Sequence, residues 1–150
     1  MSSRLPHPFM LPDLVHRSAS AVMFAASQTP DVGLEIQPAE RIGNDLYKVR
    51  LRITNKGSIP TMTFNALQKK IYPQDMLKVS GREIRVISGG VTSGLFDDVT
   101  YKPHKAEVQF LQVPGNSKVD LQFLLAGRGE ATFSYESRKA GKTSKSVVLK

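Results

Sequence analysis

The stretch of sequence that decides the fold is residues 43–61, GNDLYKVRLRITNKGSIPT. Apolar and basic side chains alternate along its first part. The apolar positions are Tyr47, Val49, Leu51 and Ile53, and the basic positions between them are Lys48, Arg50 and Arg52. A period of two predicts a β-strand with one face in a core and the other in water. The turn formers Asn55, Lys56 and Gly57 then end the strand.

The same alternation returns along the rest of the chain. Further strands are predicted at residues 32–39, 75–79, 83–87, 105–112, 118–125, 130–136 and 143–149. Turn-forming residues separate them, so about eight strands follow one another at the spacing typical of sandwiches. The sequence therefore predicts a mainly β fold, an immunoglobulin- or fibronectin-like β-sandwich with an N-terminal α-helix.

Three segments between the strongest strands are less regular. Residues 89–98 begin with two glycines and are predicted to form a long loop. Residues 105–112 are predicted to turn three apolar side chains to one side, namely Ala106, Val108 and Phe110. Residues 61–71 have the spacing of a short helix or turn, which Pro73 ends.

The N-terminal segment has a different pattern. Prolines at positions 6, 8 and 12 predict an extended lead over residues 1–11. Residues 12–28 then follow a helical period. The apolar face of this helix consists of Leu14, Val15, Ser18, Val22, Ala25 and Ala26. We therefore divide the chain into residues 1–30, a lead and helix, and residues 31–150, the sandwich, with the boundary at residues 29–31.

The composition excludes several classes of protein. The chain has no cysteine, so neither disulfides nor thiolate metal sites can form. Its longest mostly apolar run, residues 19–26, is far shorter than the roughly 20 residues of a membrane span. The net charge of +8 comes from 21 basic and 13 acidic residues, but the basic ones are scattered. This scatter favours a solvated sheet face and charged strand edges over nucleic-acid binding.

No catalytic or metal-binding set can be assembled from the sequence. The three histidines are His7, His16 and His104, and neither His7 nor His16 has the spacing of a ligand pair. His104 and Glu107 have the H-x-x-E spacing of metallocarboxypeptidase ligands, but residues three apart on a strand point to opposite faces. A Ser-His-Asp triad has no local support, although triads do assemble from distant positions. We therefore predict that this chain is not an enzyme and binds neither metal nor cofactor.

Two segments resemble a known family. In residues 7–61, a proline-rich lead and an alanine-rich helix precede the strand GNDLYKVR and the turn TNKGSIPT. Residues 129–149 contain a hairpin of the Ser-x-Lys-x-Gly type. Together they resemble the C-terminal β-sandwich domain that follows the catalytic domain in bacterial zinc carboxypeptidase-family proteins. Residues 75–102 carry no such resemblance.

The resemblance implies an accessory role for this chain. The zinc ligands and catalytic glutamate of that family belong to the upstream domain and match no position here, so zinc is expected only in the parent's catalytic domain. The parent would be an exported peptidase, periplasmic or extracellular, and Met1 would begin a fragment rather than the native protein. The upstream domain is the expected partner, and Val22, Met23 and Phe24 on the helix are expected to contact it.

Two other functions remain open. A free-standing sandwich would bind a glycan or a protein through its loops, and Tyr72 and Tyr101 are the aromatic candidates because the chain has no tryptophan. A structural module would instead assemble through an exposed strand edge. An accessory domain predicts a bare apolar helix, whereas a glycan-binding module predicts aromatic side chains along a groove near Tyr101.

Overall fold

Residues 46–55 form the predicted strand, β3 (Leu46–Asn55), in the computed structural model, which describes residues 7–93, 98–101 and 105–150. Burial alternates along the strand. Its four odd-numbered apolar side chains, at positions 47 to 53, are at most 2% exposed, and the side chains between them are half-buried. The alternation continues to Asn55, which is buried although it is polar. One face of β3 therefore belongs to the core.

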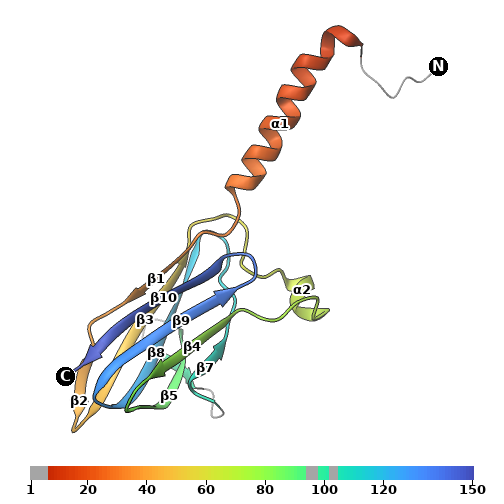
Figure 1. Cartoon of the computed structure of the whole chain (residues 1–150). Helices are drawn as coiled ribbons and strands as arrows, with labels where there is room; N and C mark the ends of the chain where they lie inside the picture. The colour runs from red at the N-terminus through yellow and green to blue at the C-terminus, as the bar shows by residue number, and fades with distance from the viewer. Residues whose placement is uncertain (1–6, 94–97, 102–104) are drawn as a thin grey trace.

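Strand β3 lies in a six-stranded antiparallel sheet, the first sheet (Figure 1). Its order is β1-β3-β8-β5-β6, and β2 also pairs with β3. The other strands are β1 (Val32–Ile36), β2 (Glu40–Gly43), β5 (Ile84–Ser93), β6 (Asp98–Tyr101) and β8 (Ser117–Gly127). Val49 pairs with Phe123 and Leu51 with Leu121, so β3 and β8 line the core together.

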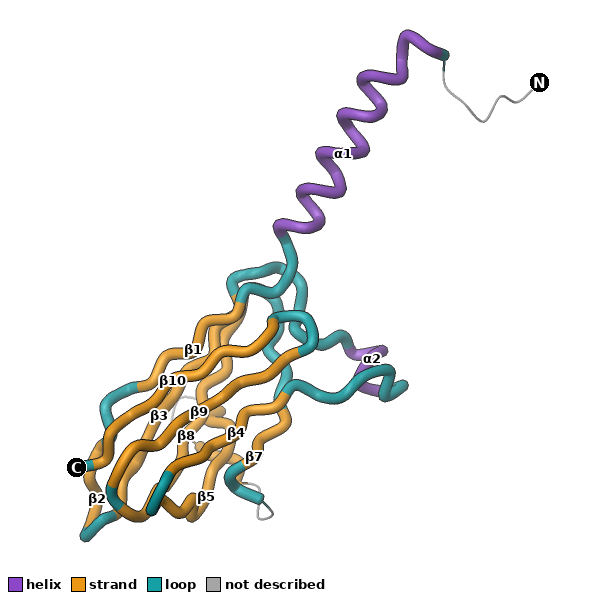
Figure 2. Tube along the Cα trace, in the orientation of Figure 1, coloured by secondary structure: helices purple, strands orange, loops and turns teal. Residues whose placement is uncertain are grey.

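A four-stranded antiparallel sheet, the second sheet, covers this core (Figure 2). Its order is β10-β9-β4-β7. The strands are β4 (Met76–Gly81), β7 (Val108–Phe110), β9 (Gly129–Ser137) and β10 (Gly141–Leu149). Phe123 of the first sheet meets Phe133 of the second edge to face, with ring centroids 5.5 Å apart. The mainly β sandwich with an N-terminal helix is therefore confirmed.

The N-terminal helical segment begins earlier than predicted, and the second helix is shorter than predicted. Residues 1–11 were expected to be extended throughout, but Pro8–Met10 form a 3₁₀ turn, η1, and α1 (Leu11–Ser27) follows directly. Proline fits there because the first turn of a helix needs no backbone donor. The predicted short helix is α2 (Phe64–Gln68), capped by Thr63, whose Oγ1 accepts from the N–H of Ala66 at 3.4 Å.

The prediction of a long loop over residues 89–98 is wrong for its first half. Strand β5 continues to Ser93 and pairs with β8 through both glycines. A Cβ added at Gly89 would overlap the ring of Phe123. The glycine is therefore present because the strand backbone runs directly over an aromatic ring in the core, not because the chain turns there.

The strand predicted at residues 105–112 is shorter than expected. Val108 and Phe110 share one face, as predicted, and this is the outer face of the sheet. Only Val108–Phe110 form a strand, and Gln109 is the buried residue at 1% exposure, while Phe110 is 49% exposed. Gln109 Nε2 donates to the carbonyl oxygens of Gly89 at 3.3 Å and Ala106 at 3.1 Å. Because these bonds satisfy the buried amide, a polar residue faces inward in this short edge strand.

Candidate interaction surfaces

Helix α1 extends away from one end of the sandwich (Figures 1 and 2). None of its residues is buried. Val22, Met23 and Phe24, which were predicted to contact a neighbouring domain, are 68%, 72% and 68% exposed. Within the described part of the chain, nothing covers these three side chains.

The half of α1 nearest the sandwich carries no charge. The ion pair of the helix, from Arg17 Nη2 to Asp13 Oδ2 at 2.9 Å, lies in the other half, and residues 18–27 read SASAVMFAAS. The side chains of residues 22 to 24 are spread over about 200° of the helix circumference. A helix that is uncharged and apolar over most of its circumference is normally covered by protein.

Hydrogen bonds fix the C-terminal end of α1 to the sandwich. Ile59 donates its backbone N–H to the carbonyl oxygen of Gln28 at 3.0 Å, and Ser58 Oγ donates to Gln28 Oε1 at 2.6 Å. Asn116 Nδ2 donates to Ser58 Oγ at 3.1 Å. We call residues 28–31, 55–61 and 113–116 the helix–sandwich junction. This junction sets the direction in which α1 leaves the sandwich.

Asn55 connects the segments of the junction from inside. Its Oδ1 accepts from the backbone N–H groups of Asp31 at 3.1 Å and Gly57 at 3.0 Å. Its Nδ2 donates to the carbonyl oxygens of Ile59 at 2.9 Å and Pro114 at 3.2 Å. Both donors and both acceptor positions of the buried amide are used, so one side chain joins three separate segments.

Two glycines allow the junction segments to approach closely. A Cβ at Gly57 would overlap the carbonyl oxygen of Thr29, and a Cβ at Gly115 would overlap that of Ser58. A larger residue at Gly57 would push away the segment that follows α1, and one at Gly115 would push the two turns of the junction apart. The Asn-Lys-Gly turn, predicted only to end a strand, therefore also holds α1 in place.

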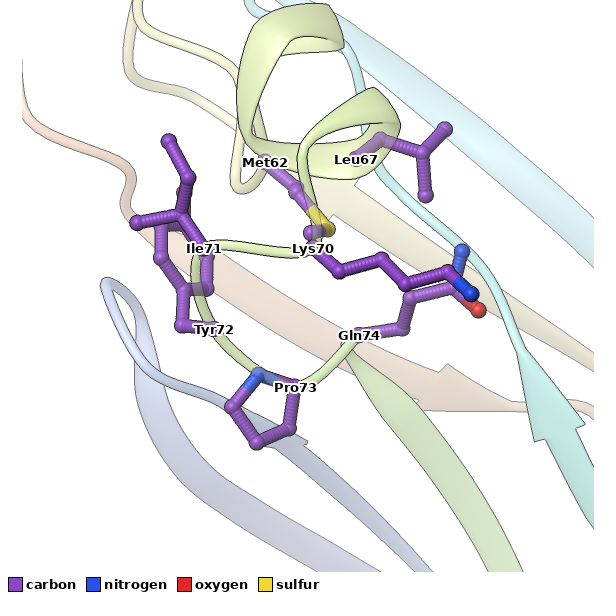
Figure 3. Close-up of a pocket in the computed structure, with 7 residues that line it drawn as sticks. All are labelled: Met62, Leu67, Lys70, Ile71, Tyr72, Pro73 and Gln74. Atoms are coloured by element: carbon purple, nitrogen blue, oxygen red, sulfur yellow. The ribbon is translucent and has the colours of Figure 1, made fainter.

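A cavity of about 510 Å³ lies beside α2 (Figure 3). Its lining comes from α2, from the segment before it and from the loop after it. The lining residues are Met62, Leu67, Lys70, Ile71, Tyr72, Pro73 and Gln74. Tyr72, one of the two aromatic candidates, is half-buried here, and its hydroxyl is buried without a hydrogen-bond partner among the described residues.

A second cavity, of about 480 Å³, lies on the other side of Pro73 and Gln74, at one end of the second sheet. We call it the Arg138 cleft. It is lined by Pro73, Gln74, Met76, Phe110, Glu136, Ser137, Arg138, Gly141 and Lys142. The guanidinium carbon of Arg138 lies 5.5 Å from the centre of the Tyr72 ring, so a residue of the first cavity lies beside a residue of the second.

Tyr72 and Tyr101 were expected to flank a glycine-rich loop. The first part of that segment, as far as Ser93, is a strand instead. The ring of Tyr72 lies beside Arg138, in the turn between β9 and β10. Tyr101 ends β6 of the first sheet, and its side chain lies outside the described ones. The sequence did not single out Arg138 as a site residue. The residues that surround it belong to segments far apart in the chain.

The basic stripe on β3 is partly neutralised by its neighbours. Arg52 Nε lies 2.6 Å from Asp120 Oδ1, and Arg52 Nη2 lies 3.2 Å from Oδ2, which is a bidentate pair. This hydrogen bonding and the charge of Asp120 raise the pKa of Arg52 above its ordinary value. Arg50 Nε donates to Gln122 Oε1 at 3.4 Å. The stripe is therefore part of a polar ladder across the first sheet.

Two of the three histidines lie in the described part of the chain, both in its N-terminal segment. His7 stacks on Phe9 with ring centroids 5.8 Å apart, His16 is exposed on α1, and His104 lies outside the described residues. No group of three or more potential metal ligands occurs among the residues that the structure describes. Within the same residues, no helix has both the length and the apolar character needed to cross a membrane.

The fold and these surfaces define a β-sandwich module with a projecting helix. The family model described as "Domain of unknown function (DUF8731)" matches residues 33–148, and this chain belongs to that family. The match covers the sandwich except the first residue of β1 and the last residue of β10, and it excludes α1. No curated protein matches the chain.

Three solved structures are distantly similar to the chain. The chain is similar to the cupredoxin domain of amoB from Nitrosocaldus yellowstonii, with 14% identity and a TM-score of 0.38, over 71% of this chain and 56% of that one. A conjugate transposon protein (27–141) from Bacteroides vulgatus has 16% identity and a TM-score of 0.42, with coverage of 80% and 86%. The PapD-like domain 7 of human CEP192 has 11% identity and a TM-score of 0.29, with coverage of 100% and 93%.

Proposed function

We propose that this chain is a non-catalytic C-terminal accessory domain of a zinc carboxypeptidase-like metallopeptidase, and that α1 packs on the catalytic domain before it. The observation that carries the proposal is α1 itself, which is uncharged near the sandwich, apolar and bare, yet held in one direction by the junction. The resemblance of residues 7–61 and 129–149 supplies the identity of the neighbour. Zinc and peptide hydrolysis then belong to that neighbour, and export of the parent is part of the same proposal.

The first test is the coding sequence in frame before Met1. The proposal expects an H-x-x-E pair, a later histidine and a glutamate shortly before this segment. A stop codon directly before a true start at Met1 would contradict it, and the accessory role would then be abandoned.

The second test introduces one charged residue on α1 of the parent protein. Val22→Asp should place a carboxylate in the interface between α1 and the catalytic domain and so lower the melting temperature of that domain. Val148→Asp is the matched control, because Val148 is 55% exposed on β10, far from α1. Equal melting temperatures for the two variants would show that α1 does not pack on the catalytic domain.

The alternative proposal is a free-standing sandwich that binds a glycan or a protein. The open cavities on both sides of Tyr72 support it. A free-standing module should bind its ligand equally well after deletion of residues 1–27, whereas an accessory domain should lose its partner with them. Measuring the affinity of each candidate ligand for the full chain and for the chain without residues 1–27 therefore distinguishes the two proposals.

A further inference from the structure

The floor of the Arg138 cleft is a single row of side chains across the second sheet. Phe110 pairs with Met76, Met76 with Glu136, and Glu136 with Lys142. Directly paired residues point to the same face of a sheet, so these four lie side by side on the outer face. The row is apolar at the β7 end and charged at the β10 end.

The lining of the cleft contains two cations, of which one is already neutralised by a carboxylate and the other is not. Lys142 Nζ lies 2.8 Å from Glu136 Oε1. Arg138, in the turn between β9 and β10, has the ring of Tyr72 beside it and no carboxylate partner among the described residues. The ring of Tyr72 restricts the guanidinium to the edge of the cleft without neutralising it.

We propose that the Arg138 cleft binds the carboxyl-terminal residue of a polypeptide when that residue has an aromatic or aliphatic side chain. The terminal carboxylate would pair with the Arg138 guanidinium, which presents two parallel N–H groups to a carboxylate. The apolar side chain would lie on Phe110, Met76 and Pro73.

The shape and chemistry of the cleft favour this occupant. A volume of about 480 Å³ accommodates one or two residues, and the cleft is open to solvent, so the remainder of a polypeptide can leave it. A nucleic acid would need several cations, and here one of the two is paired with Glu136. The proposal does not rest on the accessory role, because no residue of α1 takes part.

The test is a titration of the ¹⁵N-labelled full chain with the peptide Ac-Ala-Ala-Ala-Phe as the free acid and as the amide, followed by NMR. The acid should shift backbone amide resonances of residues 74–76, 110 and 136–142. The amide should bind at least about tenfold more weakly, because it lacks the charged hydrogen bond. Equal binding of acid and amide, or shifts confined to other residues, would overturn the proposal.

Variants then test the two ends of the cleft. Arg138→Gln should weaken the acid about tenfold, whereas Lys139→Gln, which removes the same charge from the next residue outside the lining, should not. Phe110→Ser should weaken binding of the acid and amide forms of the peptide equally. The backbone ¹H–¹⁵N spectrum of this variant shows whether its sandwich remains folded. Equal effects of the Arg138 and Lys139 variants would show that the peptide responds only to the overall positive charge, and would overturn the proposal.

A last comparison distinguishes a polypeptide end from a small acid. Phenylacetate offers the same carboxylate and ring without a peptide chain. We expect it to bind at least tenfold more weakly than the peptide acid, since the chain adds contacts at the mouth of the cleft. Binding as tight as that of the peptide would show that the occupant is a small acid, and the assignment to a polypeptide would fail.

Discussion

Single polar residues hold this sandwich together at positions where its pattern alone would place an apolar side chain. Asn55 occupies the inward position that follows Ile53 and uses its amide to join the strand to the junction. Gln109 occupies an inward position of β7 and bonds to Gly89. In both cases the buried group is satisfied by backbone atoms of other segments, so burial has little desolvation penalty.

Replacing Asn55 should have a large effect on stability. Asn55→Ala removes four hydrogen bonds and leaves buried backbone groups unpaired, so the free energy of unfolding should fall by about 3 kcal/mol. Urea unfolding followed by circular dichroism measures it. Asn65→Ala, at an exposed position of α2, should change it by less than about 0.5 kcal/mol. Equal effects of the two would contradict the role given to the Asn55 amide.

The close contact between Gly89 and Phe123 can be tested with one methyl group. Gly89→Ala should lower the free energy of unfolding by about 1–3 kcal/mol, because the new Cβ overlaps the ring. Gly33→Ala is the matched control, since nothing lies within 4 Å of the Cβ position there. Introducing Phe123→Leu together with Gly89→Ala should recover part of the loss. A Gly89→Ala protein as stable as Gly33→Ala would rule out the close contact.

Tyr135 should make the sandwich sensitive to alkali. Burial, together with the hydrogen bond at 3.1 Å from its hydroxyl to Asp75 Oδ2, raises the pKa of Tyr135 above its ordinary value of 10.0. The folded state keeps the proton that the unfolded state loses above pH 10, so stability is complete below that pH and falls above it.

The slope of this loss is measurable by urea unfolding between pH 8 and pH 11. A single retained proton corresponds to about 1.4 kcal/mol per pH unit above 10. Tyr135→Phe should be less stable at pH 8, because Asp75 loses its donor, but it should lose stability less steeply above pH 10. The same slope in both proteins would show that Tyr135 does not carry the effect.

Strands with one buried and one solvent-exposed face could be predicted from the sequence. Strands in which polar and apolar side chains do not alternate could not. Strands β3 and β9 show alternation because polar and apolar residues face different surroundings. Strand β5 contains Ser88, Gly89 and Gly90, which have no side chains large enough to reveal a period. Its pairing with β8 depends on contacts across the sheet, which a single segment does not contain.

Some features of the candidate surfaces could be predicted from the sequence and others could not. A bare helix could be anticipated from its composition, and Asn55 could have been recognised as inward-facing because it continues the odd-numbered positions of β3. The Arg138 cleft could not be anticipated. It forms only when β7, β4, β9 and the turn before β10 are placed side by side.

At the scale of the element, α1 should be dispensable for the stability of the sandwich. None of its residues is buried, so deletion of residues 1–27 should change the free energy of unfolding by less than about 1 kcal/mol. Deletion of residues 1–36 also removes β1 and the buried Leu34, and should lower it by at least about 2 kcal/mol. A large loss on the shorter deletion would mean that α1 packs on the sandwich itself.

At the scale of the whole molecule, the junction should make α1 a rigid arm. Because the chain has no cysteine, Arg17→Cys on α1 and Lys145→Cys on β10 would place two spin labels specifically. Double electron–electron resonance should then give one narrow distance distribution. Gln28 is hydrogen-bonded to Ser58 and Ile59, and Gly57 lies directly against Thr29. Ser58→Ala removes the side-chain bond to Gln28 and should broaden the distribution.

The matched control for this measurement is Ser144→Ala, an exposed serine of β10 outside the junction. It should leave the distribution unchanged. A broad distribution in the unsubstituted junction would mean that α1 swings freely. A freely swinging α1 would first have to be ordered when it packs on a catalytic domain, and that ordering would weaken the docking that the accessory role requires.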